Sequence, residues 1–406
     1  MTYRIKDVAL VNQNTLAENT DPEFRFRYID IGSVNSIGKI EVPDEDLAFA
    51  VAPSRARRLA PPGAVIVSTV RTYLRAIASV PETSDPLVFS TGFTVLEAKE
   101  CINSRFLSYY CQSQRFIDEI VARSVGVSYP AINPSEISVL PISLPRIDEQ
   151  RRIVDFLDVE TTRISRLMSL RKRQFGAIST LLFTTAKELT GRSSILGRSR
   201  DPGNQYVQLR RALSSIQTGL TPSGLQTKRI AGTIPWYTPA ALNDMLTVGE
   251  ADKFIEQNRT DVPIFDAGSI IITGIGESLG KVGYLHHPAT GNQQLTSLKP
   301  GDNIVGRFIA WQLWASTPEL REWAQYSRIR ILNNEKLKEF PIYLPDRSAQ
   351  AAIAERLDRL LETIAILQLR MQAFQSLMGE RRQALITAAV TGKFDVSSAS
   401  GRGVEE

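Results

Sequence analysis

The chain contains very few residues that bind metals or form disulfides. Its 406 residues include only two cysteines, Cys101 and Cys111, and two histidines, His286 and His287. Two cysteines are too few for a disulfide framework or a structural zinc site, which indicates a reducing compartment such as the cytoplasm. The histidines are adjacent, so on a strand they would point to opposite faces. A metal site built from histidine or cysteine is therefore not expected.

Long hydrophobic runs are also absent. No apolar stretch approaches the roughly 18 residues that a membrane helix needs, and the segment Met1–Asp7 lacks the hydrophobic part of a signal peptide. These absences predict a soluble, cytoplasmic protein. The net charge of +5 and the pI near 9.1 permit a nucleic-acid partner without establishing one.

Motifs of known catalytic sites are missing as well. The segment Gly274–Lys281 superficially suggests a phosphate cradle, but its glycine spacing is wrong and Val282 stands where a serine or threonine is needed. We interpret this segment as a loop between two strands. The sequence has neither an Asn/Asp-Pro-Pro-Tyr/Phe methyltransferase motif nor a Pro-Asp…Asp/Glu-x-Lys nuclease signature. The chain is therefore expected to have no catalytic residues of its own and to bind no cofactor.

What the sequence does contain is a long internal repeat. Pro141–Pro145 reads Pro-Ile-Ser-Leu-Pro, and Pro341–Pro345, 200 residues later, reads Pro-Ile-Tyr-Leu-Pro. The same spacing relates the following pairs: Gln150 and Gln350, Ile153 and Ile353, Leu157 and Leu357, Asp158 and Asp358, Ile164 and Ile364, Leu167 and Leu367. After a slip of one residue, Thr190-Gly191 matches Thr391-Gly392. Such self-similarity predicts a duplicated architecture.

Each copy of the repeat predicts one long helix. The proline before each copy disfavours helix, Asp148 and Ser348 are the expected N-caps, and Gly191 and Gly392 are placed to end the helices. The second copy carries a heptad seam: Ile353, Leu357, Leu360, Ile364, Leu367, Met371, Phe374 and Met378. The first copy has a patchier one: Ile153, Leu157, Ile164, Leu167, Ile178 and Leu181. Two seams in one chain predict that the two helices pair with each other as a coiled coil.

The stretches before the two helices predict mixed α/β domains. In the first, we expect residues 1–20 to be a polar lead-in, followed by strands at Phe24–Ile31, Ala64–Ser68, Ala76–Val80 and Phe93–Leu96 and a helix over Asn103–Ala122. The second stretch repeats the first faintly, because Gly268–Thr273 resembles Gly63–Ser68 and Arg307–Ile309 resembles Arg105–Leu107.

These patterns predict an α+β fold with a pseudo-twofold repeat, in which two mixed α/β domains are separated by the paired helices. The expected division is a first domain at 1–145, a helix at 146–191, a linker at 192–204, a second domain at 205–345, a helix at 346–392 and a disordered tail at 393–406.

Polar and basic residues in the loops of both domains are the candidates for binding. Arginine and lysine neutralise phosphates or pair with guanine, while asparagine and glutamine pair with adenine. The candidates in the first domain are Arg55, Arg57, Arg58, Arg71, Tyr73, Arg75, Ser128 and Tyr129. Those in the second are Trp236, Tyr237, Lys281, Asn292, Gln293, Gln294, Arg328 and Arg330. Each of these side chains could equally belong to an ordinary solvated surface.

The sequence resembles the specificity subunits of type I restriction–modification enzymes over nearly its whole length. Leu144–Ile153 is similar to the Leu-Pro-x-x-x-Glu-Gln helix start of that family. Further similarity lies in Ala52–Arg58, Ser68–Leu74, Asn292–Gln294 and Leu385–Lys393. The second helix start departs from the pattern, because Ser348-Ala349-Gln350 keeps the glutamine and lacks the glutamate.

The resemblance implies two target-recognition domains, each reading one half of a split sequence in double-stranded DNA. It further implies that the two long helices pair as an antiparallel coiled coil, which sets the spacer between the half-sites. It also implies that the chain assembles with two methyltransferase subunits and with motor–nuclease subunits. S-adenosylmethionine, ATP and Mg²⁺ would be bound by these partners. Two alternatives stay open at this point: a stand-alone sequence-specific DNA-binding protein, such as a repressor, and a coiled-coil adaptor that binds proteins without DNA.

Overall fold

The computed structural model describes residues 2–126, 129–191, 206–243, 245–326 and 330–396. The expected linker at 192–204 lies outside the described residues, as does all of the expected tail beyond residue 396. Two long helices are present, α5 (Ile147–Leu189) and α9 (Arg347–Val390). Among the described residues, no helix is long and apolar enough to cross a membrane.

The chain forms two compact units, and both long helices are divided between them. Unit 1 comprises Met1–Arg171 together with Gln372–Glu406, and unit 2 comprises Lys172–Met371. Each unit therefore consists of one α/β domain, the beginning of one long helix and the end of the other. This division differs from the expected map, in which each helix followed its own domain as a separate segment.

Unit 1 is built around a four-stranded sheet of order β2-β10-β7-β8 and a five-stranded sheet of order β3-β6-β9-β4-β5. The strands of the first are β2 (Ala9–Val11), β10 (Phe93–Ala98), β7 (Val65–Ser68) and β8 (Ile77–Ser79). Those of the second are β3 (Asn14–Thr15), β6 (Ala56–Leu59), β9 (Leu87–Ser90), β4 (Arg25–Ile29) and β5 (Leu47–Ala48). The short strand β1 (Thr2–Arg4) pairs with β11 (Pro141–Ser143).

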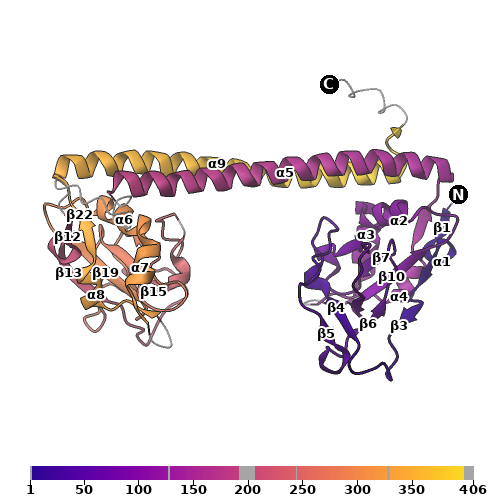
Figure 1. Ribbon diagram of the computed structural model, residues 1–406, viewed down its shortest axis with the longest axis horizontal. Helices are drawn as coiled ribbons and strands as arrows, with labels where there is room; N and C mark the ends of the chain where they lie inside the picture. Colours follow the sequence, from indigo (N-terminus) through magenta and orange to yellow (C-terminus); the bar gives the residue numbers. More distant parts are fainter. Residues whose placement is uncertain (1, 127–128, 192–205, 244, 327–329, 397–406) are drawn as a thin grey trace. The chain divides into compact units, whose positions relative to one another are not determined.

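Four short α-helices and three 3-10 turns complete unit 1. They are α1 (Ile5–Val8), α2 (Ser104–Gln112), α3 (Gln114–Arg123), α4 (Pro134–Ser138), η1 (Ile31–Ser33), η2 (Phe49–Val51) and η3 (Thr72–Leu74). Within this unit α2 lies between the four-stranded sheet and the helix pair (Figure 1). One apolar core joins the sheet, α2, α3, the start of α5 and the end of α9.

Unit 2 repeats the four-stranded sheet, in the order β13-β19-β16-β17. Its strands are β13 (Leu213–Thr218), β19 (Leu295–Pro300), β16 (Ile270–Thr273) and β17 (Val282–Tyr284). A second sheet has the order β15-β14-β18 and contains β15 (Lys253–Glu256), β14 (Thr233–Tyr237) and β18 (Thr290–Gly291). Two smaller pairs are β12 (Tyr206–Gln208) with β22 (Pro341–Tyr343) and β20 (Gln325–Tyr326) with β21 (Arg330–Ile331).

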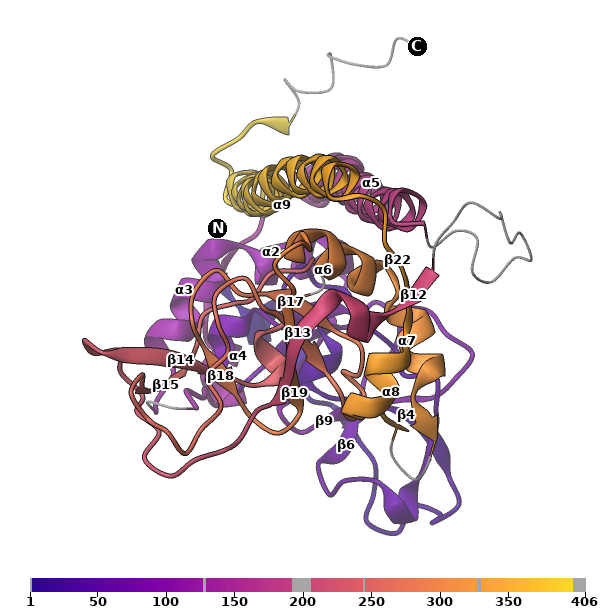
Figure 2. The ribbon, with the colours of Figure 1, turned by 90° about the vertical axis from the view of Figure 1, so that its left-hand side faces the viewer.

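The helices of unit 2 occupy places equivalent to those of unit 1. They are α6 (Gly306–Ala315), α7 (Thr317–Trp323) and α8 (Asn334–Glu339), with 3-10 turns η4 (Leu209–Ala212) and η5 (Pro239–Ala241). Figure 2 shows α6 beneath the helix pair, with β12 beside β22 just before α9 begins. The core again joins the sheet to both long helices, here through the end of α5 and the start of α9.

Inside each unit the two long helices run antiparallel and share an apolar seam. In unit 1 the side chains of Ile153 and Leu157 belong to the same core as that of Ile386. In unit 2 the side chain of Leu182 belongs to the same core as that of Leu357. The α+β fold with two mixed domains and paired long helices is therefore confirmed.

Several local expectations were wrong. Asp148 lies inside the first turn of α5 instead of capping it, and Asp346, not Ser348, caps α9, because its Oδ1 accepts the Ala349 N–H at 2.9 Å. Leu181, expected in the seam, is 64% exposed, while Leu182 faces the core. The C′ glycines were predicted correctly, because Gly191 and Gly392 have φ values of 71° and 72°.

The N-terminal segment and the helix after β10 also differ from expectation. Residues 1–20 contain three strands, of which β2 pairs with β10 and β1 with β11. The helix expected over Asn103–Ala122 is two helices that meet at Ser113. The Ser113 hydroxyl donates to the Tyr110 carbonyl at 2.6 Å, and Ser113 also occupies the N-cap of α3.

Candidate nucleic-acid interface

Main-chain hydrogen bonds join three loops at one end of the unit 1 sheet. Directly after β7, the Thr69 N–H donates to the Gly92 carbonyl at 2.8 Å, and the Thr69 carbonyl accepts the Ile132 N–H at 2.9 Å. Two residues later, the Arg71 N–H donates to the Pro130 carbonyl at 2.8 Å. These bonds fix the position of the loop after β7 against the β9–β10 turn and the segment before α4. We call these three segments, the described residues within 69–75, 90–93, 124–126 and 129–132, the loop frame of unit 1.

The same three hydrogen bonds recur in unit 2. After β16, the Gly274 N–H donates to the Gln294 carbonyl at 2.9 Å, and the Gly274 carbonyl accepts the Leu332 N–H at 2.8 Å. The Gly276 N–H donates to the Arg330 carbonyl at 3.3 Å. The loop frame is thus part of the repeat, although its side chains differ between the units.

Arg71 and Tyr129 form an exposed pair on the loop frame of unit 1. The Arg71 guanidinium carbon lies 4.6 Å from the centre of the Tyr129 ring, in cation–π geometry. Arg71 has a φ of 52°, a left-handed conformation that is costly for a residue with a Cβ and therefore needs a backbone held by its surroundings. Tyr129 is 62% exposed. The pair therefore presents a positive charge and an aromatic face to solvent from a fixed backbone.

The turn that follows Arg71 positions two more of the predicted residues. Tyr73 lies on η3 and is 55% exposed. Arg75 ends this turn with a φ of 57° and donates to the Gln114 side chain at 2.8 Å. The Thr72 and Ser124 hydroxyls, 3.0 Å apart, tie the turn to the end of α3. The backbone of the loop is thus held at both ends while Tyr73 points outward.

The arginine cluster before β7 divides into one exposed and two packed side chains. Arg55 is exposed, and its carbonyl accepts the Thr91 N–H at 2.8 Å, which places it next to the loop frame. Arg57 stacks on Phe49, with 4.7 Å between the guanidinium carbon and the ring centre. The Nε of Arg58 is buried and has no hydrogen-bond partner in the part of the chain that the structure describes. Of the three, Arg55 is exposed, whereas Arg57 and Arg58 are half-buried.

In unit 2 the amide side chains before β19 organise one another. The Asn292 amide donates to the Gln294 Oε1 at 3.0 Å, and the Asn292 Oδ1 accepts the Gln294 N–H at 3.1 Å. Gln293, which is exposed, accepts the Thr221 hydroxyl at 2.8 Å. Arg330 is exposed at the other side of the loop frame, and the half-buried Lys281 lies 3.5 Å from the Leu242 carbonyl.

The two predicted aromatic residues of β14 are less accessible. Trp236 is only 7% exposed, its indole N–H donates to the Leu220 carbonyl at 3.0 Å, and Lys253 lies over its ring at 5.6 Å. Tyr237 is half-buried, and this burial raises the pKa of its hydroxyl. Ser128 and Arg328 lie outside the described residues. Among the described residues, no group of three or more histidine, cysteine, aspartate or glutamate side chains could hold a metal ion.

A pair of repeated glutamines ties each α/β domain to the long helices. The Gln150 Oε1 accepts the Asn103 N–H at 2.8 Å, at the start of α2. In unit 2 the Gln350 Oε1 accepts the Val305 N–H at 2.9 Å, at the start of α6. Each glutamine also donates to the carbonyl of the proline before its helix, Pro145 at 3.0 Å and Pro345 at 2.8 Å.

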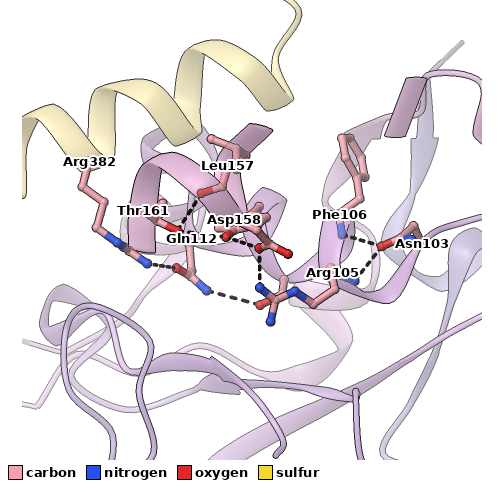
Figure 3. A network of polar contacts seen from close by, with 10 residues as sticks. Asn103, Arg105, Phe106, Gln112, Leu157, Asp158, Thr161 and Arg382 are labelled. Carbon is pink, nitrogen blue, oxygen red and sulfur yellow. Dashed lines mark hydrogen bonds and ion pairs between the residues drawn. The ribbon is translucent and has the colours of Figure 1, made fainter. Parts of the chain in front are cut away.

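A repeated aspartate, Asp158 in α5 and Asp358 in α9, links each domain to its long helix about two helical turns after the glutamine. Asp158 accepts hydrogen bonds from Arg105 and from the Tyr109 hydroxyl, the latter at 2.6 Å (Figure 3). Asp358 accepts from Arg307 and from the Trp311 indole, both at 2.8 Å. The repeat identities at 150, 158, 350 and 358 signalled these positions, but their role becomes clear only from the partners on α2 and α6.

The family pattern described as "Type I restriction modification DNA specificity domain" matches residues 1–172 and 212–373, which is most of the chain. The type I restriction enzyme MjaIX specificity subunit of Methanocaldococcus jannaschii is 25% identical over 160 residues. That match spans 38% of this chain and 37% of the relative, so it covers little more than a third of either protein.

Two solved structures are similar over nearly the full length. A chain from a structural study of complex assembly and conformational transition of the type I R-M system is 25% identical, with 96% of this chain and 97% of that chain covered and a TM-score of 0.74. The HsdS subunit from Thermoanaerobacter tengcongensis is also 25% identical, with 97% of both chains covered and a TM-score of 0.51. Together with the matched family pattern, which occupies both halves of the sequence, this shows that the chain belongs to the family of type I restriction–modification DNA specificity proteins.

Proposed function

We propose that the chain is the DNA-specificity subunit of a type I restriction–modification complex and that each unit reads one half of a bipartite DNA site. The observation that carries this proposal is the duplicated loop frame. Both units hold the same three loops with the same main-chain hydrogen bonds, while the side chains on those loops differ. Two target-recognition domains of different specificity require a backbone that is the same in both and side chains that differ.

The exposed side chains of each loop frame match the chemistry of base and phosphate recognition. In unit 1 these are Arg55, Arg71, Tyr73 and Tyr129, and in unit 2 they include Gln293 and Arg330. Arginine can pair with two acceptors of guanine and glutamine with adenine in the major groove. Trp236, Arg57 and Arg58 are left out of the proposed interface, because Trp236 is buried, Arg57 stacks on Phe49, and Arg58 is half-buried with its Nε out of reach of solvent.

The long helices support a second part of the proposal, which concerns the spacer and the partners. Because α5 and α9 each pass without interruption from one unit into the other, we propose that the coiled coil sets the spacing of the half-sites. We further propose that two methyltransferase subunits bind this chain and that motor–nuclease subunits join them for restriction. S-adenosylmethionine, ATP and Mg²⁺ would be bound by those partners, and this chain would supply specificity without catalysis.

The test is reconstitution with a domain exchange. The purified chain alone should neither methylate nor cut DNA when S-adenosylmethionine, ATP and Mg²⁺ are present. With its methyltransferase partner it should methylate a split motif, as detected by methylome sequencing. Replacing residues 1–145 with the matching domain of a relative should change one half of the motif and leave the other half intact.

The matched control is the exchange of residues 205–345, which should change the opposite half. If either exchange altered both halves, the two units would not read DNA independently. If the isolated chain still methylated or cut DNA after repurification, the proposal that catalysis belongs to its partners would be refuted.

A further inference from the structure

Unit 1 contains a polar cavity where α2 meets both long helices. Its volume is about 150 Å³, and its lining residues are Ile37, Gly38, Ser79, Arg105, Ser108, Tyr109, Gln112, Thr161 and Arg382. A single ordered water needs only roughly 10–15 Å³ measured in this way. The space is thus several times larger than one water requires, and seven of its nine lining side chains can donate a hydrogen bond.

The walls of the cavity are held in place by their own hydrogen bonds (Figure 3). Arg382 donates to the Gln112 Oε1 at 3.2 Å, and the Gln112 amide donates to the Ser108 hydroxyl at 3.2 Å. On the other side the Tyr109 hydroxyl donates to Asp158 at 2.6 Å and lies 3.1 Å from the Thr161 hydroxyl. These contacts orient polar groups around the space before any ligand arrives.

The equivalent place in unit 2 is filled with apolar side chains. The retained contacts of Arg105 with Asp158 and of Arg307 with Asp358 align the two units there. The cavity residues and their unit 2 counterparts are Ser108 and Ala310, Tyr109 and Trp311, Gln112 and Trp314, Thr161 and Leu361, and Arg382 and Leu182. All five counterparts belong to one continuous apolar core.

Two further replacements complete the contrast. Ser79 on β8 corresponds to Tyr284 on β17, and the Tyr284 ring lies 5.0 Å from the Arg307 guanidinium carbon. Gly38 corresponds to Leu246, because the two lie at the same place in equivalent turns. The Asn35 N–H donates to the Lys39 carbonyl in unit 1, and the Asn243 N–H donates to the Thr247 carbonyl in unit 2. A Cβ atom at Gly38, whose φ is 81°, would lie 2.9 Å from the Gln112 amide nitrogen, so the glycine lets the backbone of its turn approach the cavity wall closely. Leu246 is instead fully buried in the apolar core of unit 2, with a φ of 61°. The polar or small lining residues compared here are thus replaced in unit 2 by apolar or aromatic ones.

The charges around the cavity are unbalanced. Arg105 and Arg382 both line it, whereas Asp158 is the one carboxylate bonded to a lining arginine among the described residues. The Nε of Arg382 is buried and has no hydrogen-bond partner among them. Burial also lowers the pKa of Arg382, because no neighbouring anion compensates for the lost hydration. A positively charged, donor-rich space of this kind favours an anion.

We propose that this cavity binds a small free oxyanion of the phosphate or sulfate class. Arg382 and Arg105 pair with its oxygens, and the Ser79 and Ser108 hydroxyls donate to it from the sheet and from α2. The ligand is a free ion, because the volume of about 150 Å³ suits one small anion and the turn at Ile37-Gly38 forms one wall of the space. The site exists in unit 1 alone of the two described units.

The experiment measures binding of ³²P-labelled inorganic phosphate to the full chain by equilibrium dialysis at constant ionic strength. The wild-type chain should bind one phosphate saturably, and unlabelled sulfate should compete. Arg382→Leu installs the unit 2 residue and removes one charge, so it should weaken binding at least tenfold. Ser79→Tyr keeps both arginines but fills the space, and it should weaken binding as much.

Arg381→Leu is the matched control, because Arg381 is the exposed neighbour of Arg382 and does not line the cavity. Its phosphate affinity should equal that of the wild type, and circular dichroism should show all three variants folded. Absence of saturable binding by the wild type, or equal binding by Ser79→Tyr, would mean that the cavity holds only water. Displacement of the labelled phosphate by duplex DNA would assign the site to the DNA backbone and overturn the free-ion proposal.

Discussion

At the scale of single residues, Gln150 and Gln350 make equivalent hydrogen bonds that link each α/β domain to a long helix. Gln150 is fully buried and Gln350 is 2% exposed. Each side chain uses both ends of its amide, accepting from the start of a domain helix and donating to the proline carbonyl before a long helix. Removing such a side chain leaves a main-chain N–H without a partner, which costs about 1–3 kcal/mol where the group is buried.

Gln150→Ala and Gln350→Ala should therefore each destabilise one unit by about 1–3 kcal/mol. The four tryptophans, at 236, 311, 314 and 323, all lie in unit 2. In urea unfolding, Gln350→Ala should lower the midpoint seen by tryptophan fluorescence, whereas Gln150→Ala should lower the midpoint seen by circular dichroism and leave the fluorescence midpoint in place. Glu149→Ala, at an exposed neighbouring position, is the control and should change neither. Equal effects on fluorescence would mean that the units unfold together.

Arg71 offers a direct test of DNA reading by unit 1. In the reconstituted complex Arg71→Ala should weaken binding to the cognate site by about 1–3 kcal/mol, or roughly fivefold to 150-fold, and should relax specificity in one half-site only. Tyr129→Ala should cost less, about 0.5–1 kcal/mol, because it removes only the stacking partner, and Tyr129→Phe should retain most of the affinity. Arg4→Ala, an exposed arginine on β1, is the control. Unchanged affinity of Arg71→Ala in a gel shift would remove Arg71 from the interface.

The sequence located the loops of the candidate site better than it located the side chains. Arg71, Tyr129, Gln293 and Arg330 do lie on the two loop frames, because polar residues that follow short apolar strands fall at one end of a sheet. Burial was not readable in the same way. Trp236 stands between Pro235 and Tyr237 in the sequence, and this context is the same whether its indole faces solvent or the Leu220 carbonyl. Only the packed structure distinguishes the two.

At the scale of elements, local patterns were readable and distant pairings were not. The long helices were predicted because proline, heptad spacing and a final glycine act within a few residues of one another. The strands β1 and β2 were missed because their partners, β11 and β10, lie far away along the chain. The cavity was missed for a related reason. Its residues and their counterparts are offset by different numbers of positions in different segments, so no single alignment of the halves brings them together.

Insertions in the two long helices test whether their length sets the spacer between the half-sites. Seven residues inserted between Arg171 and Lys172, with seven more between Met371 and Gln372, keep the heptads in phase. At 1.5 Å per residue the insertion adds about 10 Å, which corresponds to roughly three base pairs at 3.4 Å each. The preferred spacer should shift to a new discrete value, about one to three base pairs longer, in methylation of a spacer-length library.

Insertions of two residues at the same points are the control for that experiment. They rotate the apolar seam away from the partner helix, so the complex should lose DNA binding instead of changing its spacer. An unchanged spacer preference after the seven-residue insertions would show that the coiled coil does not set the spacing.

At the scale of the whole molecule, duplication preserved the supports and changed the surfaces. The glutamine ties, the carboxylate ties and the main-chain bonds of the loop frames recur in both units. The exposed residues on the loops and the interior next to α2 and α6 have diverged. Two related domains with the same attachments can therefore acquire different specificities without losing their place on the helices.

The division of the long helices between the units has a consequence for synthesis on the ribosome. The core of unit 1 includes Ile386, Ala389 and Val390, and the Phe156 ring packs 5.4 Å from that of Phe394. Unit 2 is continuous from Lys172 to Met371 and contains all the segments of its own core. The domain that is translated first is therefore completed last, and the part of its apolar core that α9 covers stays exposed until that helix has emerged. A ribosome that stops before Ile386 would leave the N-terminal domain, and not the C-terminal one, without part of its core.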